Sequence, residues 1–322
     1  MTTLAEVPQQ QVVPQEAPVL FKNILLATDF SDASEKAFHY AVAIARLHGS
    51  KIYAVHVAPP ETSLPIPEFP EDPMFNVAKR AMETLGSRSE LKQIAHETLL
   101  RRGSVWSALS DVIRQRNIDL VVLGTHGRGG IKKLVLGSVA EEVVRRVGCP
   151  VITVGPHIDV PLLTTGEIHR ILFATDFHPA SEKALDYALH LANRFQAKLI
   201  LLHVLPPAGL PAPGLTFYNE PAINEWQAKV KAQTKENLEK LLPPYVRLCS
   251  EPEYVVGFDF TAEGILKVAA DRNVDLMVMG ANRPLSAKVS AHVLGAVTYE
   301  VIRHAKCPVL TVSAGRRRLQ EE

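Results

Sequence analysis

Three glycines and a serine mark the part of this chain where chemistry is expected. Gly124, Gly127, Gly137 and Ser138 form the pattern G-x2-G-x9-G-S, between a short apolar run and an amphipathic stretch with helical periodicity. Small residues there let backbone N–H groups close around phosphate oxygens, and the start of the following helix adds partial positive charge. The pattern therefore predicts a nucleotide site.

The loop inside this pattern carries positive charge. His126 and Arg128 flank the second glycine, and Lys132 and Lys133 follow. The connection from Thr125 to Leu136 has twelve residues. A loop of that length in a compact α/β domain is usually functional or disordered. The alternative is that the glycines only permit turns and cap the helix, and that the lysines are solvated. Other motifs are missing from the sequence, which has no G-x-x-x-x-G-K-[ST], no G-x-S-x-G and no H-E-x-x-H.

The chain carries the same unit twice. Lys22–Pro60 aligns without a gap with His169–Pro207, and nearly half of the aligned positions hold the same residue. A length of 322 residues suits two domains, and the repeat defines where they lie. We expect a flexible leader over 1–19, a first domain over 20–155, a linker over 156–168, a second domain over 169–314 and a tail over 315–322.

Short apolar runs alternate with stretches of helical periodicity in each copy. In the first copy we expect strands at 24–28, 52–57, 97–100, 120–124 and 151–154, and helices at 33–47, 75–95, 105–116 and 138–147. Parallel strands need crossover helices, which bury both faces of the sheet. The alternation therefore predicts an α/β fold of two tandem, doubly wound, Rossmann-like domains. Each domain is expected to hold a five-stranded parallel sheet with helices on both faces.

Three residues are expected to meet at one edge of the first sheet. Ligands of open α/β sheets bind at the carboxyl ends of the strands, and Asp29, Val57 and Gly124 stand at the ends of three strands. A carboxylate accepts two hydrogen bonds from a diol but repels phosphate, so Asp29 is expected at a ribose. Its alternative role, capping the next helix, is better filled by Ser31 or Asp32.

Two histidines and two cysteines occupy equivalent positions in the copies. His56 and His203 are interpreted as buried strand histidines, because each flanks the same apolar run. Cys149 and Cys307 lie beside apolar strands and are interpreted as small buried fillers rather than redox groups.

Composition and charge exclude several classes of function. The formal net charge is +1, which provides no electrostatic footprint for nucleic acid, and Arg316–Arg318 is interpreted as a solvated end. No apolar run approaches the roughly 18 residues that a membrane-spanning helix needs. The first 19 residues lack the basic and apolar regions of a secretory signal. Three cysteines without a C-x-x-C pair suit a reducing compartment, so we expect a cytoplasmic protein.

On these residues the chain resembles the universal stress protein family over almost all of its length. The strongest match is the G-x2-G-x9-G-S pattern, supported by Ala27-Thr28-Asp29-Phe30 and by His56-Val57. The resemblance implies a five-stranded parallel sheet with ATP, accompanied by Mg²⁺, at its carboxyl edge. It also implies that domains of this kind pair through their last strands, here 151–154 and 309–312, within one chain.

The resemblance implies a role for each matched residue. Asp29 would hold the ribose hydroxyls, with Ala27 and Thr28 beside it, and Val57 would contact adenine through its backbone. Ribose and phosphates would be held by the residues of the glycine pattern, which are Gly124, Gly127, Gly137 and Ser138, with Arg128 nearby.

The second copy departs from that pattern in its phosphate loop. Gly280 and Gly295 are retained, but Arg283 replaces the second glycine, Ala296 replaces the serine, and the spacing is two residues longer. A side chain where backbone must approach phosphate prevents close contact, although Arg283 could itself pair with an anion. We therefore expect ATP in the first domain only. The second domain is expected to act as an internal partner that replaces the second subunit of a dimer.

The second copy keeps the two residues expected to bind adenosine, because Asp176 and Val204 match Asp29 and Val57.

The leading hypothesis is a cytosolic, ATP-binding stress protein whose nucleotide occupancy sets the conformation of a signalling scaffold. The alternatives are a slow ATPase or phosphotransferase that uses His126 and Arg128, and a nucleotide-free interaction module. A homodimer and an unidentified protein partner stay open, whereas nucleic acid and membrane are not expected as partners.

Overall fold

The computed structural model describes residues 21–60, 72–127, 136–156, 158, 168–207, 220–242, 244, 246–281 and 296–314. The first domain consists of β1 (Asn23–Ala27), α1 (Asp32–His48), β2 (Lys51–Ala58), α2 (Pro73–Gly86), a short 3-10 turn (Ser89–Leu91), β3 (His96–Arg102), α3 (Val105–Gln115), β4 (Leu120–Gly124), α4 (Ser138–Arg146) and β5 (Val151–Val154). The second consists of β6 (Arg170–Ala174), α6 (Pro179–Phe195), β7 (Lys198–Leu205), α7 (Glu220–Lys240), β8 (Glu253–Phe258), α8 (Thr261–Asp271), β9 (Leu276–Ala281), α9 (Ala296–His304) and β10 (Val309–Ser313).

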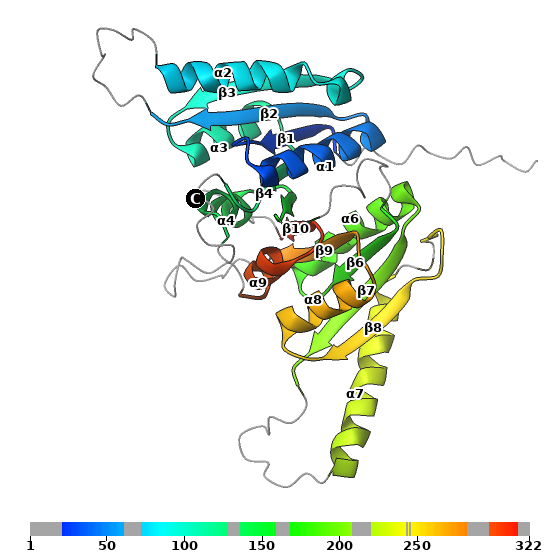
Figure 1. The fold of residues 1–322 in the computed structure, drawn as a ribbon. Helices are drawn as coiled ribbons and strands as arrows, with labels where there is room; N and C mark the ends of the chain where they lie inside the picture. Colours follow the sequence, from blue (N-terminus) through cyan, green and yellow to red (C-terminus); the bar gives the residue numbers. More distant parts are fainter. Residues whose placement is uncertain are drawn as a thin grey trace, which may run out of the picture.

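The strands of both domains form one sheet in the order β3-β2-β1-β4-β5-β10-β9-β6-β7-β8 (Figure 1). Within each domain the neighbouring strands run parallel, so the predicted α/β class with tandem parallel sheets is confirmed. At the centre β5 and β10 pair antiparallel, with Ile152 opposite Leu310. This is the pairing of last strands that the family resemblance implies.

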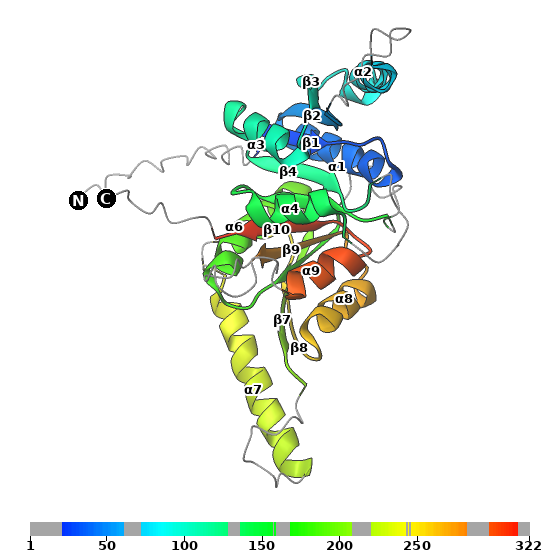
Figure 2. The same ribbon diagram turned by 90° about the vertical axis from the view of Figure 1, so that its left-hand side faces the viewer.

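Helices cover both faces of the sheet, and each covering layer continues from one domain to the other. Alternate residues of β1 point to opposite faces, so Ile24 and Leu26 pack under α1, whereas Leu25 packs under α3 and α4. The buried apolar side chains form one cluster on each face of the sheet. Both clusters include residues of β5 and β10, among them Ile152 and Val309. The contact between the domains is therefore built like the interior of a protein. Figure 2 shows α7 extending away from the edge of this body.

The helix predicted over 75–95 is wrong in its C-terminal part. α2 ends at Gly86, and only the short 3-10 turn at Ser89–Leu91 follows. A Cβ on Gly86 would lie 3.1 Å from the Thr98 side chain, and the Gly86 carbonyl lies 3.1 Å from His96 Nε2. The chain thus leaves the helix where its backbone must pack against β3.

The cysteines at the ends of the two copies are thiols in apolar surroundings. Cys307 is buried and Cys149 is half-buried. Burial raises the pKa of each thiol to about 12, so neither is a thiolate at neutral pH. Their interpretation as fillers agrees with this environment, although Cys149 is less buried than expected.

Gly280, at the C-terminal end of β9, is required by close packing of the strand against α6. A Cβ at this position would lie 2.5 Å from Ser181 N and 2.7 Å from Ala180 C, and backbone atoms cannot turn aside. Gly280→Ala should therefore lower the free energy of unfolding by about 1–3 kcal/mol, the usual cost of overpacking, as measured by urea denaturation. Gly148→Ala is the matched control, because a Cβ there meets no atom within 4 Å. Equal stability of Gly280→Ala and the control would contradict this account of the packing.

Candidate functional site

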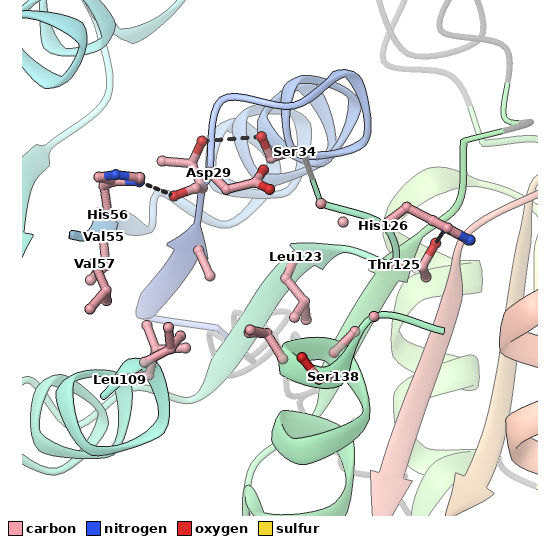
Figure 3. A pocket seen from close by; sticks show the side chains of 18 of the residues that line it. Asp29, Ser34, Val55, His56, Val57, Leu109, Leu123, Thr125, His126 and Ser138 are labelled. Carbon is pink, nitrogen blue, oxygen red and sulfur yellow. Dashed lines mark hydrogen bonds between the residues drawn. The ribbon is translucent and has the colours of Figure 1, made fainter. Parts of the chain in front are cut away.

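A cavity of about 530 Å³ opens at the carboxyl edge of the first domain (Figure 3). It lies beside the ends of β1, β2 and β4, where the chain turns from one side of β1 to the other. Such a switch point is where open α/β sheets bind ligands. Its lining includes Ala27, Thr28, Asp29, Val57, Gly124, Gly127, Gly137 and Ser138. The cavity thus brings together every predicted site residue except Arg128, which lies outside the described residues.

Asp29 stands in the turn between β1 and α1. Its Oδ1 accepts hydrogen bonds from Ser31 N at 3.0 Å and from Ser31 Oγ at 2.6 Å. Its Oδ2 points toward Gly127, because a Cβ added to that glycine would lie only 2.7 Å from this oxygen. Ser31 also caps α1 by accepting from Ser34 N, so Asp29 does not serve as that cap. The carboxylate is held from one side and directed toward the glycine loop.

The start of α4 forms the opposite wall. Gly137 N donates to Thr125 O at 2.8 Å, and a Cβ on Gly137 would approach that same oxygen to 3.0 Å. This contact joins the two ends of the glycine loop. Ser138, Val139 and Ala140 follow and line the cavity with the first turn of the helix. Unpaired N–H groups and the helix dipole make such a turn favourable for an anion.

Apolar side chains complete the cavity, and sequence reasoning did not single them out. Val105 and Leu109 come from α3, Leu123 from β4 and Leu136 from the end of the glycine loop. In Figure 3, Leu109 and Ser138 lie across the cavity from Asp29. The amphipathic pattern of α3 identifies Leu109 as inward-facing, but it does not reveal which cavity the side chain meets.

His56 and His203 are only partly buried, less than the interpretation as buried histidines requires. β2 continues past the end of β1, since Ala27 pairs with Val55 and His56 pairs only with Leu100 of β3. His56 therefore reaches the open edge of the sheet, where it lines the cavity.

His126, the neutral base that the enzymatic alternative requires, directs its ring away from the cavity. Its Nδ1 lies 2.8 Å from Thr125 Oγ1, and Figure 3 shows the ring on the side of Thr125, remote from Asp29 and Leu109. Its carbonyl, by contrast, lies 3.2 Å from Ser31 Oγ at the Asp29 turn. In this geometry His126 contributes its backbone to the site.

The second domain has a smaller cavity at the equivalent edge, of about 190 Å³, among the residues described there. Gly264 on α8 replaces Ala108, and a Cβ at Gly264 would lie 2.8 Å from Val204 Cγ1. α8 thus packs close to β7 and covers Val204, which is 8% exposed. Arg283, which stands where the first domain has Gly127, lies outside the described residues.

Asp176 is also held differently from Asp29. Its Oδ1 accepts from Ser181 Oγ and from His178 N, whereas Ser31 supplies both donors in the first domain. Partial burial would raise the pKa of Asp176, but the hydrogen bonds from Ser181 and His178 outweigh it and hold that pKa below its usual value. The carboxylate is therefore kept ionised by contacts within its own domain.

Two further searches concern metals and membranes. Across the described ranges, three or more His, Cys, Asp or Glu side chains nowhere gather in a way that could hold a metal ion. Among the helices that the structure describes, none has the length and apolar character needed to cross a membrane.

Fold and cavity define a tandem, doubly wound α/β protein with a cavity at the switch point of its first domain. The model of the universal stress protein family matches residues 20–155 and 167–313. The chain belongs to the universal stress protein family and carries two such domains in tandem.

Individual relatives agree with this assignment. A universal stress protein of Mycobacterium tuberculosis is 26% identical over 302 residues, which cover 89% of this chain and 95% of that protein. One of Thermus aquaticus is 34% identical over 141 residues, 42% of this chain and 99% of the relative. The crystal structure of a universal stress protein from Archaeoglobus fulgidus has a TM-score of 0.61 at 20% identity, and the match covers 91% of this chain and 98% of that structure. This last likeness supports the fold.

Proposed function

We propose that the first domain binds one molecule of ATP in its cavity and that nucleotide occupancy sets the conformation of a stress or signalling scaffold. One observation carries the proposal: Asp29, Val57 and the glycine pattern are far apart in sequence, yet they line the same cavity. Its volume of about 530 Å³ lies within the range of about 300–1,000 Å³ that is common for ligand pockets.

Each part of the nucleotide finds complementary surroundings in the cavity. The apolar side chains of Leu109 and Leu123 suit the adenine ring. Asp29 suits the ribose hydroxyls, since a carboxylate accepts two hydrogen bonds. The first turn of α4, beginning at Ser138, suits the phosphates. Mg²⁺ usually takes phosphate oxygens and water as ligands, so it would bind with the nucleotide and neutralise phosphate charge.

In this proposal the second domain is a structural partner without ATP. Its cavity, at about 190 Å³, falls below the usual range for ligands of this size. Val204 is covered by α8. What this domain supplies is the antiparallel pairing of β10 with β5, which protects the edge of the first sheet.

The test is a calorimetric titration of the nucleotide-stripped full chain with Mg²⁺-ATP. We expect one site per chain, weakened at least tenfold by Asp29→Asn, because a hydrogen bond to a charged group contributes about 1.5–3 kcal/mol. Asp176→Asn is the matched control and should leave both affinity and stoichiometry unchanged. Two sites per chain would overturn the role given to the second domain. No binding would leave the nucleotide-free interaction module as the better account.

A further inference from the structure

We propose that His56 is a positioning residue for Asp29 and that it sets ribose recognition through the Thr28 carbonyl and the Phe30 ring. The inference rests on the proposed function, because it assigns Asp29 to the ribose. The three consecutive residues Thr28, Asp29 and Phe30 form the turn between β1 and α1, and His56 is bonded to the first and packed on the third.

The turn contains an unfavourable backbone conformation. Phe30 has a φ of 60°, in the left-handed region that bulky residues rarely adopt. Such a residue persists only where its surroundings hold it, and these conformations cluster at functional sites. Here the Phe30 N–H donates to Thr28 Oγ1 at 3.1 Å, which closes the turn around Asp29.

His56 holds this turn from the neighbouring strand. Its Nδ1 lies 2.7 Å from Thr28 O, and its ring centroid lies 4.7 Å from that of Phe30. A carbonyl oxygen can only accept, so Nδ1 carries the proton and donates. The imidazole therefore fixes the residue before Asp29 by a hydrogen bond and the residue after it by ring contact.

Fixing both neighbours fixes the direction of the Asp29 side chain. Loss of the His56 donor would free the Thr28 carbonyl and let Phe30 relax toward a right-handed conformation. The Asp29 carboxylate would then lose its alignment toward Gly127, where Oδ2 now points. Binding of the ribose should suffer more than binding of the base, because only Asp29 moves.

The second domain repeats the same arrangement and provides a control within the chain. His203 Nδ1 lies 2.7 Å from Thr175 O, Phe177 has a φ of 58°, and the two rings are 4.7 Å apart. Asp176, between them, faces the small cavity and accepts from Ser181. Removal of either histidine donor should have a similar structural cost, but only removal of His56 should change nucleotide binding.

The experiment compares ATP with 2′,3′-dideoxy-ATP, which lacks both ribose hydroxyls, on the full chain. Wild type should prefer ATP by at least about tenfold, the value of one charge-assisted hydrogen bond. His56→Phe keeps an aromatic ring against Phe30 but removes the donor, and should reduce this preference to about threefold or less. His56→Asn places an amide donor near the Nδ1 position and should retain most of the preference, losing only what the ring contact with Phe30 contributes. His203→Phe should lower the thermal midpoint by about as much as His56→Phe and leave the preference unchanged.

The outcomes separate this inference from the proposed function. If wild type binds no ATP, both fall. If wild type prefers ATP and His56→Phe keeps that preference, the proposed function stands and the positioning role of His56 is overturned. The same holds if His203→Phe reduces the preference as much as His56→Phe. Should His56→Phe fail to fold, His56→Ala compared with His56→Asn decides, and equal loss of preference in these two variants would contradict the inference.

Discussion

Replacing Gly127 by arginine should weaken ATP binding to the first domain by about a hundredfold or more. A Cβ at this position would lie 2.7 Å from Asp29 Oδ2, so the carboxylate must leave its place. The guanidinium would also pair with Asp29 and keep the backbone N–H groups away from phosphate. Loss of two charge-assisted hydrogen bonds, each contributing about 1.5–3 kcal/mol, accounts for this magnitude. Calorimetric titration of the nucleotide-stripped chain with Mg²⁺-ATP measures it.

The control for Gly127→Arg adds the same charge at an unconstrained glycine. Gly148 is exposed, and a Cβ there meets no atom within 4 Å, so Gly148→Arg should bind ATP like wild type. Gly127→Ala should show an intermediate loss, because a methyl group displaces the Asp29 carboxylate without pairing with it. Wild-type affinity in Gly127→Arg would mean that the nucleotide does not approach this part of the loop.

The second copy carries Arg283 where the first has Gly127, so the same variant examines why the copies differ. The sequence alone showed that the residue had changed, and reasoning about phosphate contact suggested the consequence. The contact between Gly127 and Asp29 could not be predicted, because it joins two loops that are remote in sequence. One sequence, taken by itself, contains no pattern that relates such positions.

Much of the fold followed from local patterns. The apolar runs that became β1 and β4 were predicted to within a residue or two, because a buried parallel strand is apolar on both faces. The end of α2 was missed although Gly86 is a residue type that commonly ends helices, and a Cβ at Gly86 would lie only 3.1 Å from the Thr98 side chain. Local sequence patterns thus predict where a helix or strand lies better than where it ends against a neighbouring element.

The same limit applies to two site residues. Gly124 was predicted for its closeness to phosphate, yet a Cβ there would lie 2.8 Å from Ala33 C, so its packing against α1 already requires glycine. This explains why the second copy keeps the equivalent Gly280 although its phosphate loop has changed. His56 was interpreted as buried because its neighbours in the sequence are apolar. The sequence does not indicate that β2 extends beyond the end of β1.

Lowering the pH from 7 to 5 should reduce the free energy of unfolding by at least about 2 kcal/mol through two histidines between the domains. His48, at the end of α1, stacks on His190 of α6 with ring centroids 5.2 Å apart and planes at 21°. The Nε2 atoms of both rings are buried and have no hydrogen-bond partner among the described residues. Phe21 packs on His48, and the nearby charged group is Arg194, whose guanidinium donates to Leu47 O.

Burial, with smaller contributions from the neighbouring His190 and Arg194, lowers the pKa of His48 to about 4. Burial followed by Arg194 also lowers the pKa of His190. In the unfolded chain a histidine titrates near 6.5. Below that pH the unfolded chain binds protons that the folded chain does not bind. The contribution of these histidines to the free energy of unfolding is therefore fully present above about pH 6.5 and is lost as the pH decreases toward 4. The 1.5 pH units between 6.5 and 5, at 1.36 kcal/mol each, correspond to about 2 kcal/mol from His48.

The internal repeat supplies the matched variant for this test. The alignment of the two copies places Phe195 opposite His48 and Ala43 opposite His190, so the symmetry-related positions have no histidine. The double variant His48→Phe, His190→Ala copies those residues and should flatten the pH dependence of urea denaturation between pH 7 and 5. The carboxylates and the remaining histidines are common to both proteins, so the difference in slope belongs to the pair. An unchanged slope in the double variant would show that the contact between the domains tolerates protonation, and that the acid sensitivity arises elsewhere in the chain.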